Sequence, residues 1–326
     1  MEDNLIIKAL KSKNNKFKNE EEIIQKISDF LNNNFDLLKK ANQIDIKNNN
    51  GYEIDLGSIN TVINRYLNLK TIINPNDILI TEDNLMFSKL VSPYGIILTS
   101  FEGDFYHLLE LILLSILTHN VMIFTGSNYF IGSNKFLVES VNNLLKQKGY
   151  KDNFYYELDS LSLLENFKSI DKLLVIGEND FQMKYLNLSK MDTFVSGAGY
   201  YEIYIEDDSH IDLIKKIASL DKNITIYLKE DINIDIENAI IVSDIHEAIS
   251  AINYNGSGYS SSIFSSSSEN ISMFLSEIKA RNIFVNTSPT LEQKLDVTMN
   301  DLVKNKYIVM PNAYTITEDK IVIPIV

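Results

Sequence analysis

The sequence predicts an α/β protein built around a doubly wound parallel sheet. From Gly95 onward, short apolar runs alternate with amphipathic stretches of helical spacing, which is the pattern of strands joined by crossover helices. A turn, a strand, a helix and a second strand follow one another between Asn253 and Ser288, as in a βαβ unit. The 326 residues, 45% of them hydrophobic, suffice for one large domain or two ordinary ones.

The composition excludes several classes of protein. The net charge of −14 argues against a nucleic-acid binder, because phosphate contacts need clustered Lys and Arg, and it disfavours binding to anionic membranes. The absence of cysteine excludes disulfides, thiolate metal sites and a cysteine nucleophile. The four histidines lack metal-ligand spacing, so we expect no metal site. Residues 1–4 carry no signal-like segment, which predicts a cytoplasmic location.

The amino-terminal part is predicted to be a helical layer. Three acidic residues, Glu20 to Glu22, open a helix whose apolar residues, up to Leu31, share one face. Further helices are predicted over residues 35–42 and 59–69. Residues 78–91 are predicted to form a β-hairpin that turns at Glu82 to Asn84.

Alternating strands and helices follow. The apolar run 108–124 is interrupted by Glu110, His119 and Asn120, so it is predicted to be a buried helix and strand and not a membrane span. The predicted elements are strand 95–100, helix 106–117, strand 121–124, helix 134–146, strand 154–156, helix 160–167, and strands 173–176, 193–195 and 202–205. We expect these strands to share one parallel sheet.

The βαβ unit predicted between Asn253 and Ser288 can be described in more detail. Residues 255–258 form a turn, residues 262–265 a strand, and the serines from Ser265 to Ser268 offer amino-terminal caps to a helix. The following strand, residues 283–285, presents Asn286 and its polar neighbours at a carboxyl end, where open α/β sheets bind ligands. The alternative is a plain crossover with a polar turn.

A set of short segments carries a resemblance to a known family. They are residues 95–97, 101–102, 120–126, 133–134, 137–139, 197–199, 204, 244–249, 252–253, 256–258, 284–288, 301–302 and 306–309. In this order, and over nearly the whole chain, they resemble γ-glutamyl phosphate reductase, an aldehyde dehydrogenase superfamily enzyme of proline synthesis. The resemblance implies an aldehyde dehydrogenase-like fold, attack by a cysteine, and hydride exchange with NADP(H).

The chain departs from that family at three parts of the site. The cysteine segment would lie between Asp208 and residue 238, where residues 210–235 are interpreted as a short bridge in a reduced catalytic subdomain. We expect the strand at residues 224–228 to cover the exposed end of the sheet. The turn from Gly103 to Tyr106 lacks the family's basic residue and amide, and residues 289–297 lack its glycine-rich loop. We therefore assign no catalytic residue.

Two groups of residues are candidates for binding. The resemblance places a nucleotide over strand ends and a helix start, which here are Ser100, Thr125, Gly126, Ser127, Gly197 and Gly199. The bulky Tyr129 and Phe130, and the lack of a nearby Lys or Arg, favour no bound cofactor, with NADP(H) as the alternative. A pocket for a small polar metabolite is predicted from Glu102, Asn255, Ser257 and Asn286.

The predicted organisation has three parts. Residues 1–208 combine the helical layer with a Rossmann-like cofactor-type domain, residues 209–308 form the reduced catalytic-type subdomain, and residues 309–326 form a tail. The hairpin 78–91 and the apolar strand 321–326 are expected to pair between two subunits of a homodimer. The sequence favours a catalytically degenerate binding or assembly protein. The alternatives are an active NADP-dependent reductase and a metabolite-sensing module.

Overall fold

A computed structural model describes the chain except residues 1, 14, 50–51, 74–76, 83–84, 127–129, 159–160, 178, 197–200, 221–223, 233, 235, 257, 290–296, 312–314, 318–319 and 323–326. The chain divides into two compact units. One comprises Met1–Leu174, Ser189–Phe194 and Val297–Val326, and the other comprises Val175–Leu188 and Val195–Asp296. Each unit is described by itself. No helix in the described ranges has the length and apolarity needed to cross a membrane.

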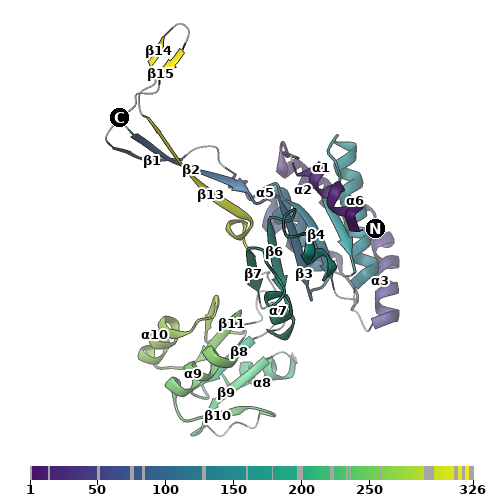
Figure 1. Cartoon of the computed structure of the whole chain (residues 1–326). Coiled ribbons are helices and arrows are strands. Elements are labelled where there is room, and N and C mark those ends of the chain that lie inside the picture. Colours follow the sequence, from purple (N-terminus) through teal and green to yellow (C-terminus); the bar gives the residue numbers. More distant parts are fainter. Residues whose placement is uncertain are drawn as a thin grey trace. The chain divides into compact units, whose positions relative to one another are not determined.

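Four helices open the first unit (Figure 1). They are α1 (Glu2–Ser12), α2 (Glu20–Asn33), α3 (Phe35–Asn49) and α4 (Leu56–Leu67). Helix α2 begins with the three glutamates, and its buried Ile23, Ile27 and Leu31 share one face, as predicted. Asp55 precedes helix α4 and caps it, because its side chain accepts a hydrogen bond from the Ser58 amide. Helix α1 has no counterpart among the predicted elements.

The first parallel sheet has the strand order β5-β4-β3-β6-β7. Its strands are β3 (Ile96–Phe101), β4 (Val121–Gly126), β5 (Phe154–Glu157), β6 (Lys172–Ile176) and β7 (Thr193–Ser196). Its connections include α5 (Phe105–Thr118), α6 (Ile131–Gln147), the 3₁₀ helix η2 (Ser162–Asn166) and α7 (Asn179–Leu186). Every residue of β3 is buried, and α5 is buried from Leu108 to Thr118, which explains the long apolar run. The helix predicted at residues 160–167 is only η2.

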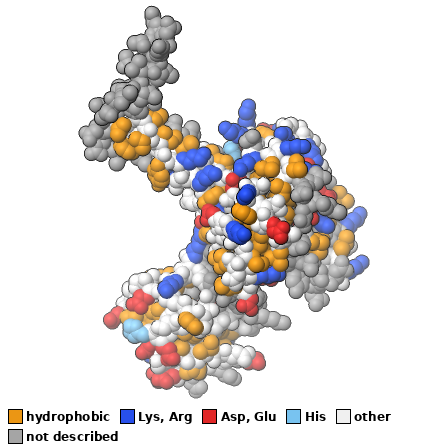
Figure 2. All heavy atoms as spheres, in the orientation of Figure 1, with side chains coloured by type: hydrophobic (Ala, Val, Ile, Leu, Met, Phe, Trp, Pro, Cys, Tyr) orange, Lys and Arg blue, Asp and Glu red, His pale blue; other side chains and the backbone are white. Residues whose placement is uncertain are grey.

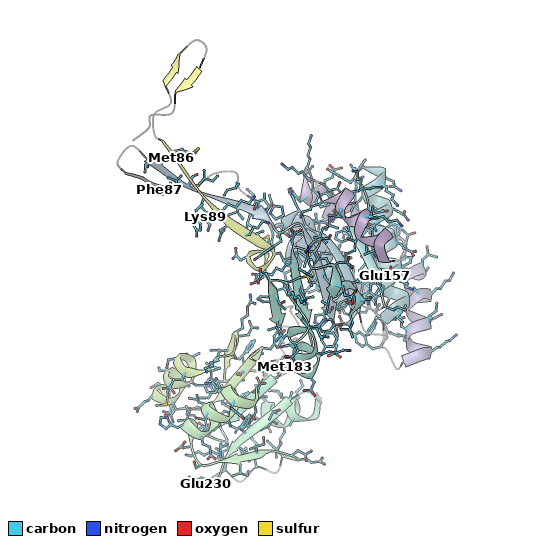
Figure 3. The ribbon with its side chains drawn as sticks, viewed as in Figure 1. Met86, Phe87, Lys89, Glu157, Met183 and Glu230 are labelled. Atoms are coloured by element: carbon cyan, nitrogen blue, oxygen red, sulfur yellow. The ribbon has the colours of Figure 1, made fainter. Side chains whose placement is uncertain are left out.

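An antiparallel ribbon holds the predicted hairpin. Strand β2 (Leu85–Pro93) pairs with β1 (Asp77–Glu82) on one side and with β13 (Val303–Pro311) on the other. Met86, Phe87 and Lys89 lie along β2 (Figure 3). The hairpin was expected to pair with a second subunit, and its partner within the chain, β13, was not predicted because the two segments lie so far apart in the sequence. Within the predicted terminal strand, Ile321 and Val322 belong to β15 (Lys320–Val322), which pairs with β14 (Thr315–Thr317), and residues 323–326 lie outside the described chain.

The second unit contains another parallel sheet, ordered β10-β9-β8-β11-β12. Its elements are β8 (Tyr201–Ile205), α8 (Ile211–Leu220), β9 (Ile224–Lys229), β10 (Ile240–Val242), α9 (Ile245–Asn255), β11 (Ser260–Phe264), α10 (Ser268–Glu277) and β12 (Asn282–Val285). One face of β8, with Ile203 and Ile205, packs against α8, and the other face, with Tyr204, packs against α9 and α10. The predicted βαβ unit is present, with Ser260 opposite Asn282 in parallel strands.

Two expectations for this region are wrong. Residues 202–205 belong to the second sheet, because β8 pairs with β9 and β11, and not to the sheet of β3. Residues 224–228 do not cover an exposed end, because β9 lies inside the second sheet between β8 and β10. The interval 210–235 is therefore a crossover helix and a strand of this sheet, and not a short bridge.

Candidate functional site

Three of the predicted cofactor-binding residues meet at the carboxyl end of the first sheet. Ser100 lies opposite Thr125 in the β3–β4 ladder, and Gly126 follows on the same edge. The hydroxyl oxygens of Ser100 and Thr125 are 2.8 Å apart, and both residues are buried. A Cβ at Gly126 would lie 2.7 Å from the Tyr156 hydroxyl, so the backbone is closely covered at this point. Ser127, Gly197 and Gly199 lie outside the described residues.

Helix α6 begins beside these strand ends, and Asp45 of α3 occupies its amino terminus. The amides of Gly132 and Ser133 donate to the two Asp45 carboxylate oxygens at 2.7 Å and 2.9 Å. The Ser133 hydroxyl donates to the same carboxylate at 2.6 Å. Amides at a helix start are groups that can bind a phosphate, and here two of them donate to Asp45.

An acid–base pair caps α5 in the turn that departs from the family pattern. The Asp104 carboxylate accepts a hydrogen bond from the His107 amide, and the His107 Nδ1 lies 2.8 Å from the same carboxylate. The Tyr52 hydroxyl donates to the other carboxylate oxygen. The contacts of Asp104 serve to cap the helix and to hold Tyr52, which is a structural arrangement.

The pKa values of this pair are displaced in opposite directions. Burial acts to raise the pKa of Asp104, but the charge of His107 and hydrogen bonds from His107 and Tyr52 lower it to about 2. Burial acts to lower the pKa of His107, but the charge and hydrogen bonding of Asp104 outweigh burial and raise it. The two groups therefore stabilise each other as an ion pair.

A groove of about 540 Å³ runs along β5, the edge strand of the first sheet, between α1 and α6. Its lining combines apolar, aromatic and charged side chains, namely Leu5, Lys8, Lys135, Val138, Glu139, Asn142, Asp152, Phe154, Tyr155, Tyr156 and Glu157. This volume lies within the range of small-molecule sites. Its lysine, aspartate and glutamate side chains would suit a ligand that carries both a positive and a negative charge.

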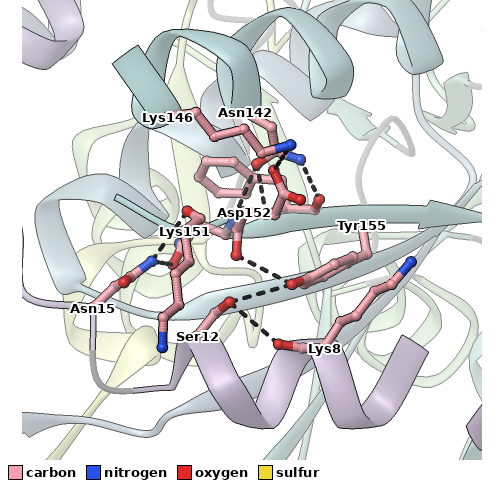
Figure 4. A network of polar contacts seen from close by, with 10 residues as sticks. Lys8, Ser12, Asn15, Asn142, Lys146, Lys151, Asp152 and Tyr155 are labelled. Carbon is pink, nitrogen blue, oxygen red and sulfur yellow. Dashed lines mark hydrogen bonds and ion pairs between the residues drawn. The ribbon is translucent and has the colours of Figure 1, made fainter. Parts of the chain in front are cut away.

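Hydrogen bonds fix the walls of the groove (Figure 4). On the α6 side, the Asn142 side chain accepts from the Phe154 amide at 3.2 Å and donates to the Phe154 carbonyl at 2.7 Å. On the α1 side, the hydroxyls of Ser12 and Tyr155 lie 3.3 Å apart, and the Tyr155 hydroxyl donates to the Asp152 carbonyl at 3.1 Å. The sequence does not predict this groove, because its residues are scattered over three distant segments.

Two of the four predicted pocket residues, Asn255 and Asn286, lie apart from each other. Asn255 ends α9 and precedes β11, whereas Asn286 follows β12, so the two lie at opposite ends of a parallel sheet. The Asn286 amide group is also engaged, because it accepts from the Ser265 amide at 2.9 Å and donates to the Ser265 carbonyl at 3.0 Å. Glu102 belongs to the first unit, and Ser257 lies outside the described residues.

The described part of the chain contains no candidate metal centre. Among the described residues, no group of three or more His, Asp or Glu side chains could hold a metal ion. Asp45, which caps α6 from α3, is not among the residues predicted from the sequence. It lies in a polar stretch of α3, and nothing in its sequence surroundings separates it from a solvated acid.

Comparisons with known proteins place the chain beside one family of enzymes. No protein-family model matches the chain. It is 22% identical to γ-glutamyl phosphate reductase of Acetivibrio thermocellus over 263 residues, covering 64% of this chain and 61% of that protein. With the reductase of Dictyoglomus turgidum it shares 21% identity over 216 residues, covering 60% of this chain and 52% of that protein. The chain thus spans less than two thirds of these relatives' length.

Solved structures agree on the fold. γ-Glutamyl phosphate reductase from Thermotoga maritima superposes with a TM-score of 0.74 at 16% identity, covering 97% of this chain and 100% of that one. Glyceraldehyde-3-phosphate dehydrogenase GapN from Methanocaldococcus jannaschii, complexed with NADP, gives a TM-score of 0.70 at 10% identity, covering 95% and 94%. The predicted resemblance to γ-glutamyl phosphate reductases is confirmed, and the fold is aldehyde dehydrogenase-like.

Proposed function

We propose that this chain, with its aldehyde dehydrogenase-like fold, is a catalytically degenerate relative of γ-glutamyl phosphate reductases that acts as a binding or assembly protein. The observation that carries the proposal is the absence of cysteine from all 326 residues. The resemblance implies a cysteine that attacks the acyl group. A serine could replace it only with an adjacent base, because a free hydroxyl is barely nucleophilic.

The internal contacts of the polar residues support this proposal. Ser100 and Thr125 bond to each other, and Asn286 bonds to the backbone of Ser265. Internal hydrogen bonds of this kind are expected of polar groups that stabilise the fold. The Asp104–His107 pair serves as a helix cap.

A turnover assay tests the proposal. The purified chain is incubated with NADPH and γ-glutamyl phosphate, and with NADP, phosphate and glutamate semialdehyde for the reverse reaction. We expect no change in NADPH absorbance above the enzyme-free rate, while the Thermotoga maritima reductase, assayed in parallel, turns over. Turnover by this chain would refute the proposal, provided that it disappears when one residue of the chain is replaced.

Two alternatives follow from specific observations. Similarity to reductases, and to a dehydrogenase complexed with NADP, supports an NADP-dependent oxidoreductase of the proline-biosynthesis type. The groove along β5 supports a module that binds a small polar metabolite. The turnover assay decides the first, and a melting temperature that rises with metabolite concentration would favour the second.

A further inference from the structure

We infer that the groove along β5 binds a free α-amino acid that has an apolar side chain. The inference deepens the proposed function and rests on it, because a chain that has lost its chemistry is proposed to act by binding. The groove, of about 540 Å³, lies within the first unit. None of the described residues that line it is among those predicted to hold a nucleotide or a polar metabolite.

The floor of the groove is apolar and aromatic. Leu5 of α1, Val138 of α6 and Phe154 of β5 line it and are only 9%, 4% and 1% exposed. Tyr155 and Tyr156 point to opposite sides of the strand, because the Tyr155 hydroxyl lies against α1 and the Tyr156 hydroxyl accepts a hydrogen bond from α6. These groups can cover the apolar side chain of a ligand from water, which favours its binding.

The rim of the groove carries four exposed charged side chains, two of each sign. They are Lys8 of α1, Lys135 and Glu139 of α6, and Glu157 at the end of β5. None of the ion pairs found between described residues includes any of them. A free amino acid carries a carboxylate and an ammonium group close together, so it offers a partner to both signs, whereas a ligand with one charge offers a partner to only one.

The backbone of β5 adds polar groups along the groove. Strand β5 is an edge strand, and the amide and carbonyl of Phe154 turn away from β4, because both bond to the Asn142 side chain. Backbone groups alternate in direction along a strand, so Tyr156, two residues further on, directs its amide and carbonyl to the same side. An amide donor and a carbonyl acceptor suit the carboxylate and the ammonium group of an amino acid.

Isothermal titration calorimetry of the full chain tests the inference, with L-phenylalanine as the probe. We expect saturable binding of one molecule per chain. N-Acetyl-L-phenylalanine lacks the ammonium group, L-phenylalaninamide lacks the carboxylate, and L-glutamate lacks the apolar side chain. Each of these three compounds should therefore bind at least tenfold more weakly than phenylalanine.

Two variants locate the binding at the rim of the groove. Lys135→Glu and Glu139→Lys reverse exposed charges, so both proteins should fold, and each should weaken phenylalanine binding at least tenfold. Glu53→Lys is the matched control, because Glu53 is exposed and lies outside the lining of the groove, and it should leave binding unchanged.

Four outcomes would overturn the inference. They are the absence of saturable phenylalanine binding, a comparison compound that binds as tightly as phenylalanine, rim variants that bind as the wild type does, and an equal loss in Glu53→Lys. Turnover in the NADPH assay would refute the proposed function whichever result the titration gives. Absence of phenylalanine binding without turnover would refute only the role of the groove.

Discussion

At the scale of single residues, the Asp104–His107 pair predicts a pH dependence of stability. The pKa of His107 is raised above its ordinary value of 6.5. The stabilisation that its charge provides is therefore complete below pH 6.5 and is lost as the pH rises through the raised pKa. We expect the loss of unfolding free energy caused by His107→Gln to be larger at pH 5.5 than at pH 8.5, measured by urea denaturation of both proteins.

The pKa of Asp104 sets the lowest pH at which the pair stabilises the fold. The pKa of Asp104 is lowered from 3.8 to about 2, so its contribution is present above pH 3.8 and is lost as the pH falls towards 2. His246→Gln provides the control, because His246 is exposed and pairs with no carboxylate among the described ion pairs. An effect of His107→Gln that does not change with pH would contradict the prediction.

The sequence could predict some site residues and not others. Ser100, Thr125 and Gly126 could be grouped, because the carboxyl ends of neighbouring parallel strands meet at one edge of a sheet. Asp45 could not be found, because its partners Gly132 and Ser133 lie far along the chain. The role of Asn286 could not be predicted, because the sequence does not show whether the side-chain amide of a residue at a strand end bonds to a ligand or to the backbone.

At the scale of elements, the side chain of Asn142 on α6 forms hydrogen bonds with the backbone of the edge strand β5 and of the residue before it. The Asn142 side chain, 8% exposed, accepts from the amides of Asn153 and Phe154 and donates to the Phe154 carbonyl. Asn142→Ala would leave these buried groups without a partner, which costs about 1–3 kcal/mol. We expect a loss of unfolding free energy of this size in urea, and faster hydrogen exchange at the Phe154 amide.

A neighbouring position on α6 offers a matched control. Lys146 forms an ion pair with Asp152 at 2.7 Å, with side chains 54% and 33% exposed. Exposed pairs of this kind contribute less than about 1 kcal/mol. Lys146→Ala should therefore cost less than Asn142→Ala. An equal cost would show that Asn142 contributes no more than a surface contact.

The elements themselves were largely predictable, because the spacing of apolar residues reflects local structure. Helix α2 and strands β3 and β4 agree with their predicted ranges to within a few residues. The interval 210–235 was misinterpreted although it carries the signal. Ile214 and Ile217, three residues apart, are buried on one face of α8, and Ile226 of β9 packs against them. The periodicity of residues 210–235 thus predicts a helix and a strand, whereas the resemblance to family segments implies a short bridge.

At the scale of the whole molecule, the sequence did not predict that the strands form two parallel sheets. Strands buried on both faces are continuous apolar runs, and such runs do not reveal which strand lies beside which. Strand β8 pairs with β11, which follows nearly sixty residues later in the chain, as the partners Tyr201 and Ser260 show. Pairing of this kind is settled by packing against α8, α9 and α10, and not by local sequence.

The ribbon of β1, β2 and β13 has an exposed edge, which predicts that copies of the chain associate there. Strand β13 is an edge strand, and its alternate residues Tyr307 and Val309 are 71% and 54% exposed. Hydrophobic side chains gather on the described part of the ribbon (Figure 2). An apolar edge strand is a template for pairing with another chain. We propose that two copies pair through this ribbon. Light scattering should then give twice the 37.3 kDa of one chain.

Charged replacements on that strand test the assembly. The double variant Tyr307→Asp and Val309→Asp places two carboxylates where the copies would meet, and carboxylates facing each other across an interface cost several kcal/mol. We expect the variant to elute as a monomer with an unchanged far-ultraviolet circular dichroism spectrum. Tyr254→Asp is the matched control, because Tyr254 is 89% exposed on α9 and should leave the dimer intact. A monomeric wild type, or a double variant that still dimerises, would show that β13 does not join two copies.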